Sequence, residues 1–192
     1  MDLARSNNKD FFDANKKLYQ KEVKGAFEAF VEHLISRMSK TYQLGDLKAS
    51  DCIFRINRDV RFSKDKTPYK LQMSALITKG GKKNMSAAAL YFEIGPEFVH
   101  IYSGVYMPEK AQLQSIRSKI ANDIKTFTAI IQDKEFVKYF GSPKGERSKI
   151  LPPELKAAAS ECSYIFNKQF YIVHTFESER ILESGLDDYI LK

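Results

Sequence analysis

The 192-residue sequence contains no tryptophan, only two cysteines and only three histidines, and it has no long apolar run. Cys52 and Cys162 lie far apart without C-x-x-C spacing, so we expect buried, reduced thiols and neither a disulfide framework nor a metal site. A helix that crosses a bilayer needs about 20 apolar residues, and segment 1–10 lacks the hydrophobic stretch of a signal peptide. These absences predict a cytoplasmic protein with no membrane association.

Familiar catalytic motifs are also missing. The sequence has no G-x-S-x-G nucleophile elbow, no H-E-x-x-H helix and no G-x-G-x-x-G dinucleotide loop. The turn at 80–83 reads GGKK, which is too short for a nucleotide-phosphate loop. We therefore expect no cofactor, and the sequence leaves open whether the protein is an enzyme.

Hydrophobic periodicity predicts the order of the secondary structure. Apolar residues recur every three to four positions from Ser6 to about Met38, which predicts one long helix that could break at Gly25. Ser6, Asn7 and Asn8 supply candidate capping side chains at its start. Alternation then predicts strands, and further helical patterns follow between 108 and 191. Asn122 or Asp123, and later Asp133, would restart helical segments, and a closing helix is expected from Glu177 to about Leu191. The expected strands are 52–62, 70–78, 85–94, 98–106 and 169–176. Short connections favour antiparallel pairing, so we predict a single α+β domain over residues 1–192, with helices packed on an antiparallel sheet of about five strands.

Positive charge is concentrated in one part of the chain. Between residues 54 and 83, nine basic residues accompany two acidic ones, a net charge of +7, while the rest of the chain is neutral. In an extended strand, Arg55, Asp59 and Arg61 would share one face, whereas Arg58 would lie on the apolar face with Phe62. Guanidinium groups bind phosphate or carboxylate through paired hydrogen bonds. The pattern is typical of an anion site, and it also fits an internal arginine–aspartate network.

The turn around residue 96 indicates a second group of polar side chains. If Gly95 faces Phe98, Glu93 lies opposite His100 and Tyr91 lies opposite Tyr102 on one polar, aromatic face. A carboxylate beside a histidine suits general acid or base catalysis, although such pairs are also common surface contacts. The candidate catalytic residues are Glu93 and His100. The candidate ligand-binding residues are Arg55, Arg58, Asp59, Arg61, Lys64, Lys66, Tyr69, Lys70, Tyr91 and Tyr102.

Three functions fit these residues. The preferred hypothesis is binding of a small anionic ligand that bears phosphate or carboxylate. The first alternative is a nucleic-acid-binding module, in which tyrosines stack on bases and basic side chains follow the phosphates. The second alternative is a structural or protein-interaction domain with an internal arginine–aspartate network.

The segment FRINRDVRFSKDKTPYK at 54–70 resembles the signature of the family called domain of unknown function 2461, which is widespread in bacteria and occurs in some fungi. NNKDFFDANKKLY at 7–19, GGKK at 80–83 and GVYMPE at 104–109 are also similar to its pattern. The resemblance covers most of the first 140 residues and supports the α+β fold. It implies no activity for any residue, because the family has no established one.

Overall fold

The computed structural model describes residues 3–191 and begins with one continuous helix. Helix α1 (Lys9–Leu18) passes through a π-helical segment (Tyr19–Lys24) into α2 (Gly25–Met38). The side chain of Asn8 caps it by accepting a hydrogen bond from the Phe11 N–H at 2.9 Å. The predicted long helix is therefore confirmed. At Gly25 it does not break, because the wider π-helical turn just before this residue keeps the backbone helical.

Four strands form an antiparallel sheet in the order β1-β2-β3-β4. They are β1 (Met73–Ile77), β2 (Ala89–Ile94), β3 (Phe98–Val105) and β4 (Phe170–Glu177). The predicted α+β class is confirmed, but the described residues form four strands and not about five.

The expected strand at 52–62 is wrong. This part of the chain follows the short helix α3 (Ala49–Cys52) and forms only isolated bridges. One bridge joins Ile53 to Ala75 of β1, and the other joins Asn57 to Tyr69, which precedes β1. The physical reason lies in the partner segment, because Pro68 has no N–H to donate to a ladder. Between residues 58 and 67, side chains instead make hydrogen bonds with other residues of the same segment.

The hairpin between β2 and β3 closes in the predicted register. The Gly95 N–H donates to the Phe98 carbonyl at 3.0 Å. The Phe92 and Val99 side chains are fully buried on the dry face. This register places Glu93 and His100 opposite each other on neighbouring strands.

The remaining helices are short. They are α4 (Lys110–Asn122), α5 (Ile124–Ile131), α6 (Lys134–Phe140), α7 (Lys156–Glu161) and α8 (Leu186–Leu191). Asp123 and Asp133 cap α5 and α6, as their positions before helical patterns predicted. The single closing helix expected over 177–191 is wrong, because a 3₁₀ turn (Ser178–Leu182) and Gly185, with φ of +82°, precede α8. Among residues 3–191, no helix is long and apolar enough to cross a bilayer.

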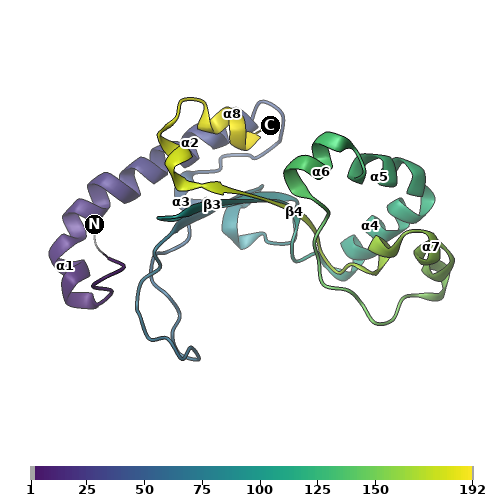
Figure 1. The fold of residues 1–192 in the computed structure, drawn as a ribbon, viewed down its shortest axis with the longest axis horizontal. Coiled ribbons are helices and arrows are strands. Elements are labelled where there is room, and N and C mark those ends of the chain that lie inside the picture. Colours follow the sequence, from purple (N-terminus) through teal and green to yellow (C-terminus); the bar gives the residue numbers. More distant parts are fainter. Residues whose placement is uncertain (1–2, 192) are drawn as a thin grey trace. The chain divides into compact units, whose positions relative to one another are not determined.

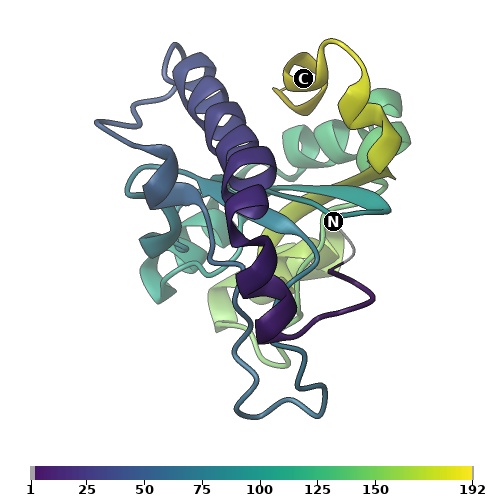
Figure 2. The same cartoon turned by 90° about the vertical axis from the view of Figure 1, so that its left-hand side faces the viewer.

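The chain divides into two compact units, and the expected single domain stays a prediction. Unit 1 contains Met1–Lys83, Tyr91–Ile101 and Thr175–Lys192, and unit 2 contains Asn84–Leu90 and Tyr102–His174. In unit 1, the long helix lies across the sheet strands (Figure 2). Phe27 of α2 contacts Phe92 of β2 with ring centres 5.6 Å apart. In unit 2, Ile120 of α4 belongs to the same buried cluster as Ile165 and residues around α7. Figure 1 labels both helices.

Candidate functional site

The strongly charged segment of unit 1 is an irregular loop, residues 54–70, which we call the basic loop. The backbone holds both ends, because the Phe54 N–H donates to the Ser74 carbonyl and the Lys70 N–H donates to the Ile56 carbonyl. Its middle extends away from the strands as the blue loop at the lower edge of Figure 2. The loop is therefore anchored at its base and exposed at its tip.

Exposure alternates along the first half of the basic loop. The odd-numbered residues from 55 to 61 are exposed, and the even-numbered residues from 54 to 60 are half-buried, as the alternating sequence predicted. Phe62 does not follow this pattern, because its side chain is 96% exposed and not on an apolar face. The segment thus keeps the two-sided character of a strand only as far as residue 61.

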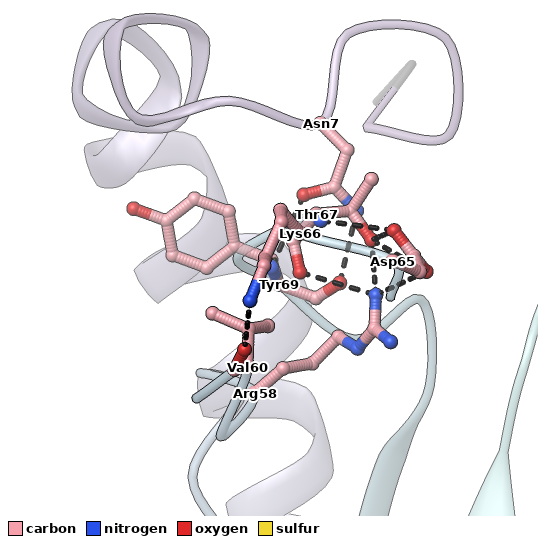
Figure 3. Close-up of polar contacts among 7 residues, drawn as sticks. All are labelled: Asn7, Arg58, Val60, Asp65, Lys66, Thr67 and Tyr69. Atoms are coloured by element: carbon pink, nitrogen blue, oxygen red, sulfur yellow. Dashed lines mark hydrogen bonds and ion pairs between the residues drawn. The ribbon is translucent and has the colours of Figure 1, made fainter. Parts of the chain in front are cut away.

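Arg58 connects the two arms of the basic loop (Figure 3). Its Nη1 donates to the Asp65 carboxylate at 2.5 Å, to the Thr67 carbonyl at 3.1 Å and to the Thr67 hydroxyl. The backbone N–H of Thr67, and after it the Arg58 guanidinium, lowers the pKa of Asp65 to about 2. Among residues 3–191, the Nε and Nη2 groups of Arg58 have no hydrogen-bond acceptor.

Arg61 is paired within the same loop. Its Nε and Nη2 donate to the two Asp59 oxygens at 2.9 and 2.7 Å, and these hydrogen bonds lower the pKa of Asp59. Both aspartates of the loop are thus bound to an arginine, so the arginine–aspartate network is present. Arg55 and Lys64 are exposed, and neither has a carboxylate within 4.0 Å in the described part of the chain.

Two lysines of the basic loop are held by groups that carry no charge. Lys66 Nζ donates to the Val60 carbonyl at 2.9 Å, which closes the loop tip (Figure 3). Lys70 Nζ lies 5.7 Å from the centre of the Phe54 ring, a cation–π contact. Among the described residues, neither ammonium group has a carboxylate within 4.0 Å.

Tyr69 lies in the core and not at the loop surface. Its side chain is 7% exposed and stacks on Phe12 of α1 with ring centres 4.1 Å apart. The Asn7 amide donates to the Tyr69 carbonyl at 2.9 Å and accepts from its N–H at 3.1 Å (Figure 3). Sequence reasoning assigned Asn7 only to helix capping, and no local pattern connects it to a residue 62 positions away.

The base of the basic loop is linked to the polar face of the sheet. The Phe54 ring packs edge-on against Tyr91 with centres 6.0 Å apart, and the Tyr91 hydroxyl donates to the Glu93 carboxylate at 2.8 Å. On the neighbouring strand, His100 Nδ1 lies 2.9 Å from the Thr175 hydroxyl. Glu93 and His100 thus each have a polar partner on the sheet.

Tyr102 belongs to unit 2, whereas the basic loop belongs to unit 1. Its ring lies 6.3 Å from the ring of Tyr171 on β4. His174, on the same strand, has Nδ1 2.9 Å from the Tyr139 carbonyl. Within residues 3–191, no group of three or more His, Cys, Asp or Glu side chains could hold a metal ion.

The two cysteines are free and buried, as predicted. Burial raises the pKa of Cys52 to about 11, so this thiol is protonated at neutral pH and is a poor nucleophile. The GGKK turn has a structural role, because Gly81, with φ of +61°, packs against the Asp51 backbone. Lys82 of this turn donates to the Ser50 carbonyl at 2.5 Å.

The comparison with protein families gives a match over the whole chain. The family is described as "Conserved hypothetical protein (DUF2461)", and its model matches residues 1–192. The chain belongs to this family. The resemblance carried by the DUF2461 signature at 54–70 is therefore confirmed. No curated protein and no solved structure gave a significant match. Because the description of the DUF2461 family names no activity, the case for a function depends on the geometry above.

Proposed function

We propose that the basic loop binds an anionic ligand that bears phosphate or carboxylate groups. The observation that carries the proposal is the balance of charge, with six basic and two acidic residues between 54 and 70 and both aspartates already paired with arginines. Four cations remain without a carboxylate within 4.0 Å among residues 3–191, namely Arg55, Lys64, Lys66 and Lys70. Such a concentration of uncompensated charge attracts anions.

The shape of the loop supports this proposal. Asn7 holds one arm, the hydrogen bonds of Arg58 join the two arms, and Lys66 closes the tip. A site that is ordered before binding loses less conformational entropy when the ligand arrives. In this proposal the exposed side chains of Arg55 and Lys64 contact the anion, and the Arg55 guanidinium offers it paired donors.

Catalysis is not part of the proposal. Glu93 and His100 lie on the sheet, where they contact Tyr91 and Thr175 respectively. Tyr69 is also left out of the ligand contacts, because its ring packs in the core. The proposed site is thus smaller than the set of residues that the sequence suggested.

A second candidate function is binding of single-stranded nucleic acid. The observation that favours it is Phe62, which is 96% exposed with the Arg61 guanidinium 5.8 Å from its ring centre. Proteins that bind single strands combine cations for the backbone with aromatic side chains on which bases stack. An exposed aromatic ring within a basic loop offers both features.

The test of anion binding is a titration of the full chain with pyrophosphate at low salt. We expect the double variant Arg55→Gln/Lys64→Gln to bind about tenfold more weakly than the wild type, a loss of about 1.4 kcal/mol. The control is Lys16→Gln/Lys17→Gln, which removes the same charge from exposed positions of α1 and should leave the affinity unchanged. Equal weakening by both double variants would mean that only the net charge matters, and this result would overturn the proposal.

A titration with a single-stranded oligonucleotide separates the two candidates. Nucleic-acid binding weakens steeply with salt, with a logarithmic slope of about 0.7 for each phosphate contacted on a single strand. Loss of one stacked base costs roughly 1–3 kcal/mol, so Phe62→Ala should weaken oligonucleotide binding and leave pyrophosphate binding unchanged. If the oligonucleotide does not bind at low salt, the second candidate is excluded.

A further inference from the structure

A cleft in unit 2 combines an apolar surface with positive charge. Its volume is about 470 Å³, and small-molecule sites typically have roughly 300–1,000 Å³. The lining residues are Lys149, Ile150, Leu151, Lys156, Ala159, Ser160 and Phe166. The lining comes from segment 149–151, from helix α7 and from Phe166. Figure 1 labels the helix.

The apolar lining includes both buried core residues and an exposed side chain. Leu151 and Ala159 belong to the buried core of unit 2, so they form a firm floor. Ile150 is 84% exposed, and the Phe166 ring is half-buried. Burial of an isoleucine side chain is favourable, and Ile150 gains little from it in the uncovered cleft. A ligand with an apolar portion would bury this surface.

The charged part of the lining has a single sign. Lys149 and Lys156 are exposed, and in the described part of the chain neither has a carboxylate within 4.0 Å. The Arg147 guanidinium lies 5.4 Å from the centre of the Phe166 ring and adds a third cation beside the cleft. Among the residues that the structure describes, no aspartate or glutamate lines the cleft. The cleft therefore complements an anion and repels a cation.

The walls are held by hydrogen bonds before any ligand arrives. Arg117 of α4 is 6% exposed, and its Nη2 donates to the Ser148 hydroxyl at 2.7 Å and to the Asn167 carbonyl at 2.9 Å. The Ser148 N–H donates to the Phe166 carbonyl at 2.7 Å. The residues next to Lys149 and Phe166 are thus joined, which holds these two parts of the lining in position and lowers the entropic cost of binding.

From these contacts we propose that the cleft binds a small amphiphilic anion, namely an aliphatic chain that ends in a carboxylate. The chain covers Ile150 and Phe166, and the carboxylate pairs with Lys149 and Lys156. A single carboxylate can pair with both lysine ammonium groups while the aliphatic chain covers the mainly apolar lining. A polyanion without such a chain would leave the apolar surface uncovered. The proposal uses residues of unit 2 only, so it is independent of the basic loop.

The first test is calorimetric titration of the full chain with decanoate below its micelle concentration. Acetate provides the head group alone, and decyltrimethylammonium provides the same chain with the opposite charge. We expect decanoate to saturate a single site. The affinity for acetate and the affinity for decyltrimethylammonium should each be at least about tenfold lower. Equal binding of decyltrimethylammonium would indicate adsorption to any apolar surface and would overturn the proposal, as would equal binding of acetate.

Matched variants locate the binding. Lys149→Gln/Lys156→Gln should weaken decanoate binding about tenfold, whereas Lys119→Gln/Lys125→Gln removes two exposed lysines of unit 2 and should have no effect. Ser160→Trp fills the cleft without changing the charge, and it should abolish decanoate binding while the melting temperature stays close to that of the wild type. Wild-type affinity for decanoate in the Lys149→Gln/Lys156→Gln variant would overturn the proposal.

Discussion

Arg117 is a buried guanidinium whose hydrogen-bond acceptors in the described part of the chain are all uncharged, and its removal tests how the core of unit 2 is held. Its Nε and Nη2 both donate to the Asn167 carbonyl, and Nη2 also reaches Ser148 and the Phe166 carbonyl. Burial lowers the pKa of Arg117. The side chain therefore stabilises unit 2 only if these hydrogen bonds outweigh its loss of hydration.

The expected loss of stability depends on how many hydrogen-bond donors each acceptor keeps in Arg117→Met. This variant preserves most of the aliphatic stem of the arginine. The Phe166 carbonyl still accepts from the Ser148 N–H, and the half-buried Ser148 hydroxyl can turn to water. The Asn167 carbonyl loses both of its donors. One buried acceptor without a partner costs about 1–3 kcal/mol, so we expect the free energy of unfolding to fall by about 2 kcal/mol. Arg117→Ala also leaves a cavity and should cost about 4 kcal/mol.

The assay is urea denaturation, combined with amide hydrogen exchange over residues 144–171 to assign the loss to unit 2. Arg117→Lys keeps the charge with fewer donors and should lie between wild type and Arg117→Met. The control is Arg147→Met, which removes an exposed arginine that donates to the Ser163 carbonyl, and its effect should be small. Replacing buried charges by apolar residues can be neutral or stabilising. An Arg117→Met variant as stable as the wild type would therefore refute the reasoning.

Two further predictions concern single residues. Gly104 has φ of +134°, and a Cβ atom there would lie 2.2 Å from the Phe170 carbonyl oxygen. Gly104→Ala should therefore lower the free energy of unfolding by on the order of 3 kcal/mol. A melting temperature equal to that of the wild type would contradict this prediction. Hydrogen bonds from Thr67 and Arg58 lower the pKa of the Asp65 carboxyl from 3.8 to about 2. The contribution of the Asp65 carboxylate to folding stability is therefore complete above pH 3.8 and is lost as the pH falls toward 2. NMR titration of the carboxyl checks the pKa, and Asp65→Asn should lack this part of the acid dependence, so an unchanged acid transition would refute the prediction.

Local chemistry was sufficient to predict much of the fold from the sequence. The long first helix follows from the spacing of its apolar residues, and Asp123 and Asp133 mark two helix starts because their side chains satisfy free N–H groups. Gly95 and Phe98 set the hairpin register within a few residues of each other. These features depend on neighbours in the chain, so period and residue type are enough to find them.

The candidate site was predictable as a set of residues but not as a geometry. Alternation placed Arg58 on one side of a strand, yet the segment folds back at a loop, and Arg58 meets Asp65 across it. Tyr69 looked available for a ligand, but Phe12, 57 positions earlier, takes its ring into the core. The loop itself was visible in the sequence as a concentration of charge, which needs no partner to be recognised.

Contacts between distant parts of the chain were decided by the tertiary structure alone. Arg117 reaches the Asn167 carbonyl across 50 positions, and it also bonds to Ser148, so it joins the segments next to Phe166 and Lys149 in the cleft of unit 2. No periodic pattern records such a contact, because hydrogen bonds and packing act through space and any suitable acceptor would satisfy the guanidinium. Sequence determined which residues are charged, apolar or able to turn the chain, whereas only the three-dimensional arrangement determined which charges are paired and which remain available to a ligand.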